Sequence, residues 1–264
     1  MKVGSLEILP LLDGHGREPA GSSLTRPGVD DPWACHQDLV DAEGDLALTV
    51  GGFLLRTGGR TIVLDAGVGT IDNGRYKGGR FPESLRAAGV APEDVTDVVF
   101  THLHFDHVGW ATQKGSVFFP NATYRVHEAD WRHFLDGETA ESGAVRKLSP
   151  LADRWELFTD DTTLAPGLDT RHTPGHTPGT TVFVVSDAGE RALLLGDVAH
   201  SVVELTAPDW EAVFDVDPRA AQAARNALAD ELVDGPHALV GGHFPELHFG
   251  RLVSTTGQRR FIPL

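Results

Sequence analysis

Apolar and β-branched residues recur along this chain in short runs separated by Gly- and Pro-rich turns, a pattern typical of β-strands. A hairpin is predicted over residues 46–65, with strands at 51–56 and 61–65. The apolar run at 95–100 predicts a short buried strand. Further strands are predicted at 5–12, 117–119, 123–127, 155–162, 168–172, 180–186, 191–196 and 238–243, with a closing hairpin at 250–253 and 260–262.

Three segments have helical features. Short helices are predicted at 82–88 and 128–135. The strongest signal lies at 217–235, because Asp217 can cap the helix and Pro218 suits its first position. The apolar stripe of this segment would pack on a sheet.

The segment 13–44 is polar, rich in Gly and Pro, and without a clear period. A loop of this length in a compact domain is often a lid or a partner-binding segment. Trp33 could cover a substrate pocket or contact a second subunit of a homodimer. A surface loop with one anchoring Trp explains the pattern equally well.

One stretch carries most of the candidate chemistry. Residues 101–109 contain the spacing His-x-His-x-Asp-His directly after the predicted strand at 95–100. If the backbone stays extended, the rings of His102 and His104 face the same way. One metal ion could take this pair, and a second could take Asp106 and His107.

A dinuclear centre needs more than four ligands, and later strand ends supply them. A tight Gly/Pro turn holds His172 and His176, and either could be a ligand. The apolar run before Asp197 and the run before His243 each end in a ligand-type residue. Because these groups must converge, we predict a single domain over residues 1–264.

The composition limits the partners of the chain. The net charge of −16 disfavours a nucleic-acid backbone or an anionic membrane, although solubility alone explains most of this acidity. Cys35 is the only cysteine, so no intrachain disulfide can form. The N-terminus shows no signal-peptide pattern and no segment approaches transmembrane length, so we expect a cytoplasmic protein.

From about Leu46 onward, five motifs in order resemble the metallo-β-lactamase fold superfamily of metallohydrolases, closest in pattern to its quorum-quenching lactonase and organophosphate hydrolase-like branch. The motifs are Asp65-Ala66-Gly67, the His/Asp cluster, the His176 turn, Gly196-Asp197 and His243. The resemblance implies an α/β fold, a four-layer αββα sandwich. It also implies that Asp65 supports the ligands. It selects His176 over His172 and assigns His102, His104 and His176 to one metal ion, Asp106, His107 and His243 to the other, and Asp197 as the bridge.

The expected function is hydrolysis by a hydroxide that bridges two divalent ions, most simply zinc, with cobalt, manganese or iron suiting the same ligands. The substrate would be a small carboxylic ester or lactone, with Asp106 orienting the hydroxide. His200 stands where the resembled lactonases place a tyrosine, and it could donate a proton or simply line the pocket. Nearby aromatic residues could line an apolar pocket or pack in the core: Phe105, Trp110, Trp210, Phe214 and Phe244.

Three alternatives remain open from the sequence. Phosphotriester or phosphodiester hydrolysis could use the same centre. A mononuclear iron dioxygenase acting on thiol persulfides would need no second site at Asp106, His107 and His243. A non-catalytic, metal-stabilised binding protein is disfavoured by the intact set of ligand-type residues.

Overall fold

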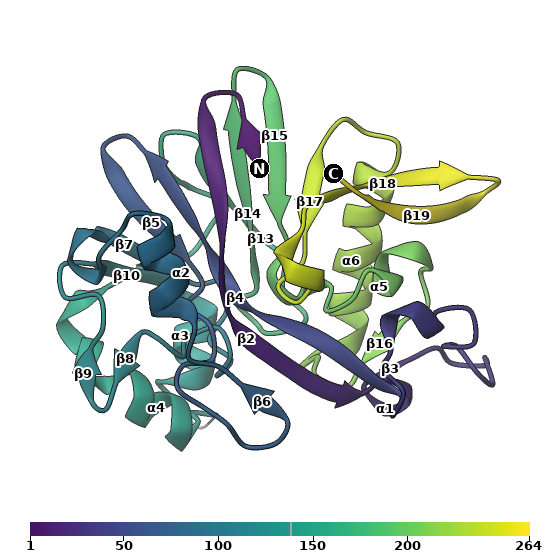
Figure 1. Ribbon diagram of the computed structural model, residues 1–264, viewed down its shortest axis with the longest axis horizontal. Coiled ribbons are helices and arrows are strands. Elements are labelled where there is room, and N and C mark those ends of the chain that lie inside the picture. Colours follow the sequence, from purple (N-terminus) through teal and green to yellow (C-terminus); the bar gives the residue numbers. More distant parts are fainter. Residues whose placement is uncertain (138) are drawn as a thin grey trace.

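Two large sheets face each other in the computed structural model, which describes residues 1–137 and 139–264 (Figure 1). The first sheet has the strand order β1-β2-β4-β5-β7-β10-β11, and β6 pairs with β2. Its strands are β1 (Lys2–Val3), β2 (Leu6–Pro19), β4 (Asp45–Thr57), β5 (Arg60–Leu64), β6 (Tyr76–Lys77), β7 (Asp97–Val99), β10 (Thr123–His127) and β11 (Trp155–Phe158).

The second sheet has the order β12-β13-β14-β15-β17-β18-β19. Its strands are β12 (Thr163–Ala165), β13 (Leu168–His172), β14 (Thr181–Asp187), β15 (Glu190–Leu194), β17 (Ala238–Val240), β18 (Gly250–Thr255) and β19 (Gln258–Pro263). Two small ribbons complete the strands, β3 (Leu24–Thr25) with β16 (Glu211–Ala212) and β8 (Thr112–Gln113) with β9 (Ser116–Val117).

Helices cover the outer side of each sheet (Figure 1). On the first sheet lie α2 (Phe81–Ala87), α3 (Glu128–Phe134) and α4 (Ser142–Leu148), and on the second lie α5 (Val203–Thr206) and α6 (Pro218–Leu232). The Asp217 side chain caps α6 by accepting a hydrogen bond from the amide of Ala220 at 3.0 Å, as the sequence predicted. Among the residues that the structure describes, no helix is long and apolar enough to cross a membrane.

The alternation of side chains along the central strands explains the four layers. Phe53 and Leu64 belong to the core between the two sheets, whereas Leu54 and Val63 belong to the core under α2 and α3. Strands that are apolar on both faces must be covered on both faces. The predicted αββα sandwich is confirmed.

The prediction that the chain becomes a loop at residue 13 is wrong. Strand β2 continues to Pro19, with a register shift between Leu12 and Gly14 where it pairs with β4. A Cβ at Gly14 would lie 1.8 Å from the carbonyl oxygen of Lys77, so glycine is needed for this close approach. Glycines and Asp13 therefore hid the strand by interrupting its apolar pattern.

The rest of this segment contains α1 (Ala20–Ser23) and β3. Trp33 is buried against Trp210, with ring centroids 5.3 Å apart, and its indole N–H donates to the carbonyl oxygen of Leu24 at 3.1 Å. Trp33 therefore anchors the segment to the body of the domain. Its role as a lid or dimer contact stays a prediction.

We expect the core between the sheets to carry much of the stability. Replacing Leu64, which is 1% exposed, with alanine should lower the free energy of unfolding by about 2–5 kcal/mol, because the cavity cannot close fully. The control Leu157→Ala, at a leucine that is 41% exposed, should cost less than about 1 kcal/mol. Urea unfolding followed by circular dichroism measures both, and equal losses would contradict this assignment of the core.

Candidate metal centre

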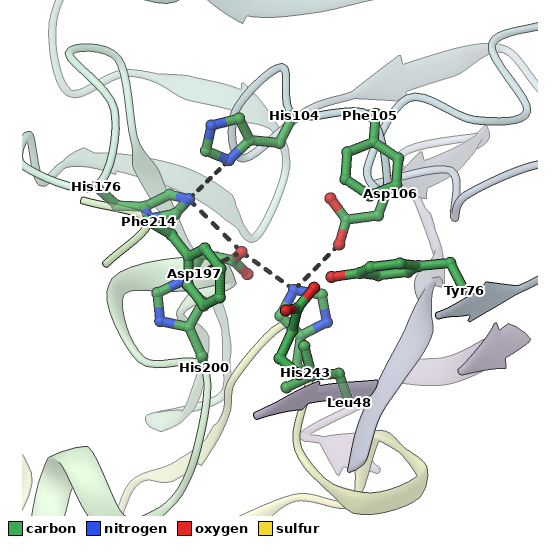
Figure 2. Close-up of a pocket in the computed structure, with 11 residues that line it drawn as sticks. Leu48, Tyr76, His104, Phe105, Asp106, His176, Asp197, His200, Phe214 and His243 are labelled. Atoms are coloured by element: carbon green, nitrogen blue, oxygen red, sulfur yellow. Dashed lines mark hydrogen bonds and ion pairs between the residues drawn. The ribbon is translucent and has the colours of Figure 1, made fainter. Parts of the chain in front are cut away.

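The proposed ligands all lie just beyond the ends of strands, at one rim of the two sheets. The loop after β7 holds His102, His104, Asp106 and His107. The remaining ligands follow β13, β15 and β17, namely His176, Asp197 and His243. Rigid strands thereby bring residues that are far apart in sequence to one place (Figure 2).

Three histidines form the first cluster. The Nδ1 of His104 lies 3.0 Å from the Nε2 of His102 and 2.9 Å from the Nε2 of His176. The two Nε2 atoms are 3.2 Å apart. Burial lowers the pKa of all three rings, that of His104 to about 3. Neutral imidazoles whose lone pairs converge in this way suit a divalent cation.

The second cluster contains Asp106, His107 and His243. The Nε2 of His243 lies 3.6 Å from Asp106 Oδ2 and 3.1 Å from Asp197 Oδ2. The Nε2 of His107 lies 3.3 Å from the same Asp197 oxygen. Asp197 Oδ2 is also 3.7 Å from His102 Nε2 and 3.6 Å from His176 Nε2, so this carboxylate stands between the two clusters.

The charge balance of the second cluster favours a cation. Burial lowers the pKa of His107, but the carboxylates of Asp197 and Asp65 raise it well above its ordinary value. A raised pKa here means that the surrounding carboxylates stabilise positive charge, which a metal ion would supply. His107 Nε2 and Asp197 Oδ1 are buried without a hydrogen-bond partner among the described residues. The residues present therefore fit divalent ions.

Hydrogen bonds on the outward nitrogens hold the histidine rings in place. Asp65 accepts from His107 Nδ1 at 2.9 Å. The same carboxylate accepts a hydrogen bond from the Thr101 hydroxyl at 2.7 Å, and the hydroxyl oxygen of Thr101 lies 3.0 Å from His102 Nδ1. The Nδ1 of His243 lies 2.9 Å from the carbonyl oxygen of Thr49. Each of these contacts leaves the Nε2 lone pair directed inward.

Asp130 joins the two loops that carry the first cluster, and sequence reasoning missed it. Its Oδ2 accepts from the amide of Leu103 at 2.9 Å and its Oδ1 from the amide of Gly179 at 2.6 Å. Leu103 lies between two candidate ligands, and Gly179 follows the His176 turn. Burial raises the pKa of Asp130 to about 6, although these hydrogen bonds lower it. An acidic residue in the first turn of a helix gave no signal for this role.

Two glycines allow the loops to approach one another. Gly196 has φ of +53°, and a Cβ there would lie 2.8 Å from the Cβ of Thr101. A Cβ at Gly242 would lie 2.5 Å from Asp197 Oδ1. Any side chain at these positions would push the ligand loops apart.

A buried ion network lies behind the site. Arg225 pairs with Glu204 and lies 3.4 Å from Asp215. Asp215 in turn is 3.1 Å from His176 Nδ1, on the outward side of that ring. The network was invisible in the sequence, because nothing local marks a charged residue on a helix as buried.

His200 lies between this network and the pocket. Its Nε2 is 3.7 Å from Asp197 Oδ2, and its Nδ1 is 3.5 Å from Glu204. Neither ring nitrogen has a hydrogen-bond partner within the described part of the chain. Burial lowers the pKa of His200, but the carboxylates of Glu204 and Asp197 raise it to about 9.

A pocket of about 200 Å³ opens beside the two clusters. The described residues that line it are Glu18, Leu48, Tyr76, His104, Phe105, Asp106, His176, Asp197, His200, Phe214 and His243. Of the aromatic residues singled out in the sequence, Phe105 and Phe214 line the pocket. The others are buried in the core: Trp110, Trp210 and Phe244.

His172, the other candidate in the turn, points elsewhere. Its Nε2 lies 2.9 Å from the carbonyl oxygen of Pro178, and its ring stacks on His127 with centroids 3.9 Å apart. His172 is therefore a hydrogen-bonded histidine at the end of a strand, whereas His176 reaches the first cluster.

A sandwich with ligand-type residues gathered at one rim defines a class of metal-binding α/β proteins. Residues 52–243 match the family described as the Metallo-beta-lactamase superfamily. This match covers most of the chain, so the protein belongs to that family. The family and the clusters together support divalent metal binding.

Relatives found by sequence include N-acyl homoserine lactonases. The chain is 27% identical over 174 residues to an N-acyl homoserine lactonase of a Bacillus species, covering 59% of this chain and 66% of that protein. It is 33% identical over 134 residues to the N-acyl homoserine lactonase AttM of Agrobacterium fabrum, covering 46% and 47%. The matched part thus spans about two thirds or less of the length of these relatives.

Solved structures match over the whole chain. One is described as AidC, a dizinc quorum-quenching lactonase in complex with a product, N-hexnoyl-L-homoserine, with a TM-score of 0.89, 25% identity and coverage of 100% of this chain and 96% of that chain. Another is described as hydrolase AbOPH in the beta lactamase superfamily, with a TM-score of 0.86, 25% identity and the same coverage.

Asp65→Asn tests how the site is held. The amide cannot accept from His107 and Thr101 as a carboxylate does, so we expect zinc affinity to fall about 10–100-fold. Competition with a chromophoric chelator measures this, with Asp153→Asn at an exposed position as the control. Unchanged affinity in a folded Asp65 variant would show that the carboxylate does not support the ligands.

Proposed function

We propose that this protein is a metal-dependent hydrolase of carboxylic esters or lactones that works with two divalent ions, zinc in the first instance. The observation that carries the proposal is the set of inward-facing histidine nitrogens gathered around Asp197, with the outward nitrogens of four of the five rings in contact with other groups. The names of the lactonase relatives and the product in the AidC complex support a lactone as substrate.

The ligand assignment follows the two clusters. His102, His104 and His176 would hold one ion, and Asp106, His107 and His243 the other, with Asp197 shared between them. Imidazole and carboxylate ligands suit zinc, and also cobalt, manganese or iron. Ions held there would lower the pKa of water so that it can act as the nucleophile at neutral pH, and would polarise the carbonyl of the substrate.

Side chains of the protein would position the attacking group and protonate the leaving oxygen. Asp106 borders the pocket and can orient the attacking group by accepting a hydrogen bond through its carboxylate. His200 also borders the pocket, and its unpartnered Nε2 can donate a proton to the leaving oxygen. Apolar side chains exclude water from the rest of the cavity, among them Leu48, Phe105 and Phe214.

The gathering of Asp106, His107 and His243 weighs against a mononuclear iron dioxygenase, which would have no use for a second cluster. Phosphotriester or phosphodiester hydrolysis remains the second candidate, because the same ligands would serve it. An apolar pocket favours an ester or lactone with an apolar remainder.

Metal removal and His107→Ala together test the dinuclear proposal. Chelation should abolish hydrolysis of an aryl ester or lactone, and zinc should restore it. His107→Ala should lower the metal content from two ions per chain to one and turnover by about 10²-fold or more, because the second cluster loses one of its three ligands. Metal analysis beside a substrate panel measures both, and full metal content with unchanged turnover would refute the proposal.

His200→Asn tests proton donation. With an alkyl ester, whose leaving group needs a proton, we expect kcat to fall about 10²-fold. With a 4-nitrophenyl ester, whose leaving group departs as an anion, the fall should be less than about threefold. Equal losses for both esters would assign His200 to the pocket wall instead.

A further inference from the structure

The pocket has one charged residue that neither belongs to the metal clusters nor has a role in the proposed reaction. Glu18, near the end of β2, lines the pocket together with Leu48 of β4 and Tyr76 of β6. It is only 8% exposed. Among the described residues that line the pocket there is no lysine or arginine.

The pairing of the strands explains why Glu18 faces inward. Gly16 pairs with Leu48 on β4 and with Tyr76 on β6, and Glu18 lies two residues further along β2, on the same face. A Cβ at Gly16 would lie 2.5 Å from the ring of Tyr76, so the glycine lets this ring lie against the strand. The β2 extension thus builds a pocket wall with a carboxylate in it.

Glu18 has a cationic partner outside the pocket. The Nη1 of Arg75 lies 3.2 Å from Glu18 Oε2, but the Arg75 side chain is 66% exposed and does not line the pocket. The pocket side of Glu18 has no cation beside it among the described lining residues. Burial raises the pKa of Tyr76, and the negative charges of Asp106 and Glu18 raise it further, so this wall carries a phenol next to carboxylates.

On the basis of the proposed function, we infer that Glu18 makes this pocket select ester or lactone substrates whose remainder is uncharged or positively charged. An anionic group on the part of the substrate that lies against this wall would lose its water and meet Glu18, with no lysine or arginine among the described lining residues to offset the charge. In the proposed reaction the scissile carbonyl would lie beside the metal ions, so an anionic group elsewhere on the same substrate would find no cation at the described part of the Glu18 wall. The overall charge of −16 repels anions further at long range.

Two esters that differ by one charge measure this selection. The substrates are 4-nitrophenyl methyl adipate, which is neutral, and 4-nitrophenyl hydrogen adipate, which carries a distal carboxylate. For the zinc-loaded protein, kcat/KM should favour the neutral ester at least about tenfold, and Glu18→Gln should reduce this preference about tenfold. The matched control is Glu7→Gln, which removes the same charge from an exposed position on the same strand.

Arg75→Gln gives a test in the opposite direction. Removing the outer cation leaves the Glu18 charge less compensated, so the preference for the neutral ester should rise. Because Arg75 is largely exposed, this variant allows the selection to be measured even if Glu18→Gln fails to fold.

Binding of amides that cannot turn over gives a readout independent of hydrolysis. Calorimetry compares N-phenylhexanamide with its 6-amino derivative, which carries an ammonium group at the distal end. Wild-type protein should bind the ammonium derivative at least as tightly as the neutral amide. Glu18→Gln should weaken binding of the ammonium derivative alone, about tenfold.

The outcomes separate the proposed function from the selection by charge. Loss of the cation preference in Glu18→Gln without any ester turnover by wild-type protein would overturn the proposed function but support the selection. If the substrate preference of Glu18→Gln stays within twofold of the wild-type preference in both assays, the inference that Glu18 selects substrates by charge is overturned. The selection is also overturned if Glu7→Gln changes the preference as much as Glu18→Gln, or if neither amide binds.

Discussion

The carboxylate of Asp65 accepts hydrogen bonds from Thr101 and His107, just beyond the ends of β5 and β7. Through the Thr101 hydroxyl it also reaches His102. One buried acid therefore fixes the orientation of a ring in each of the two clusters. Without that constraint, several buried histidines whose lone pairs face one another would rotate away or take up protons. The sheets provide the distance between the clusters, and these hydrogen bonds provide the direction of each ring.

A second constraint joins the two halves of the sandwich. Asp130, at the start of the helix that covers the first sheet, accepts hydrogen bonds from both ligand loops of the first cluster. Arg225 pairs with Glu204 and lies beside Asp215 behind the second sheet. Buried charges of this kind contribute little to stability by themselves, because their desolvation offsets most of their attraction. They set which arrangement of the loops is allowed, while the apolar core supplies the free energy that keeps the sheets together.

Local signatures in the sequence marked the candidate ligands, whereas the four layers followed from the family resemblance and the strand pattern was only compatible with them. A run such as residues 95–100 marks a strand, and His102 to His107 follow it directly. Glu18 and Tyr76 were not predicted, because Asp13 and the glycines after it interrupt the apolar alternation of β2. Their position depends on pairing between β2, β4 and β6, and these strands are too far apart in the sequence for a short stretch to reveal it. Arg225 was missed for the same reason, since its burial is decided by residues far away in the chain.

His243 follows the strand β17, and its outward nitrogen lies against the carbonyl of Thr49 on β4. During synthesis on the ribosome, the segment with His102 emerges about ten seconds before His243 at typical elongation rates. The first sheet can pair its strands in that interval, but neither cluster is complete until the second half arrives. The complete set of candidate ligands is therefore available only late in synthesis. A nascent chain stalled before residue 243 would lack one of the candidate ligands of the second cluster.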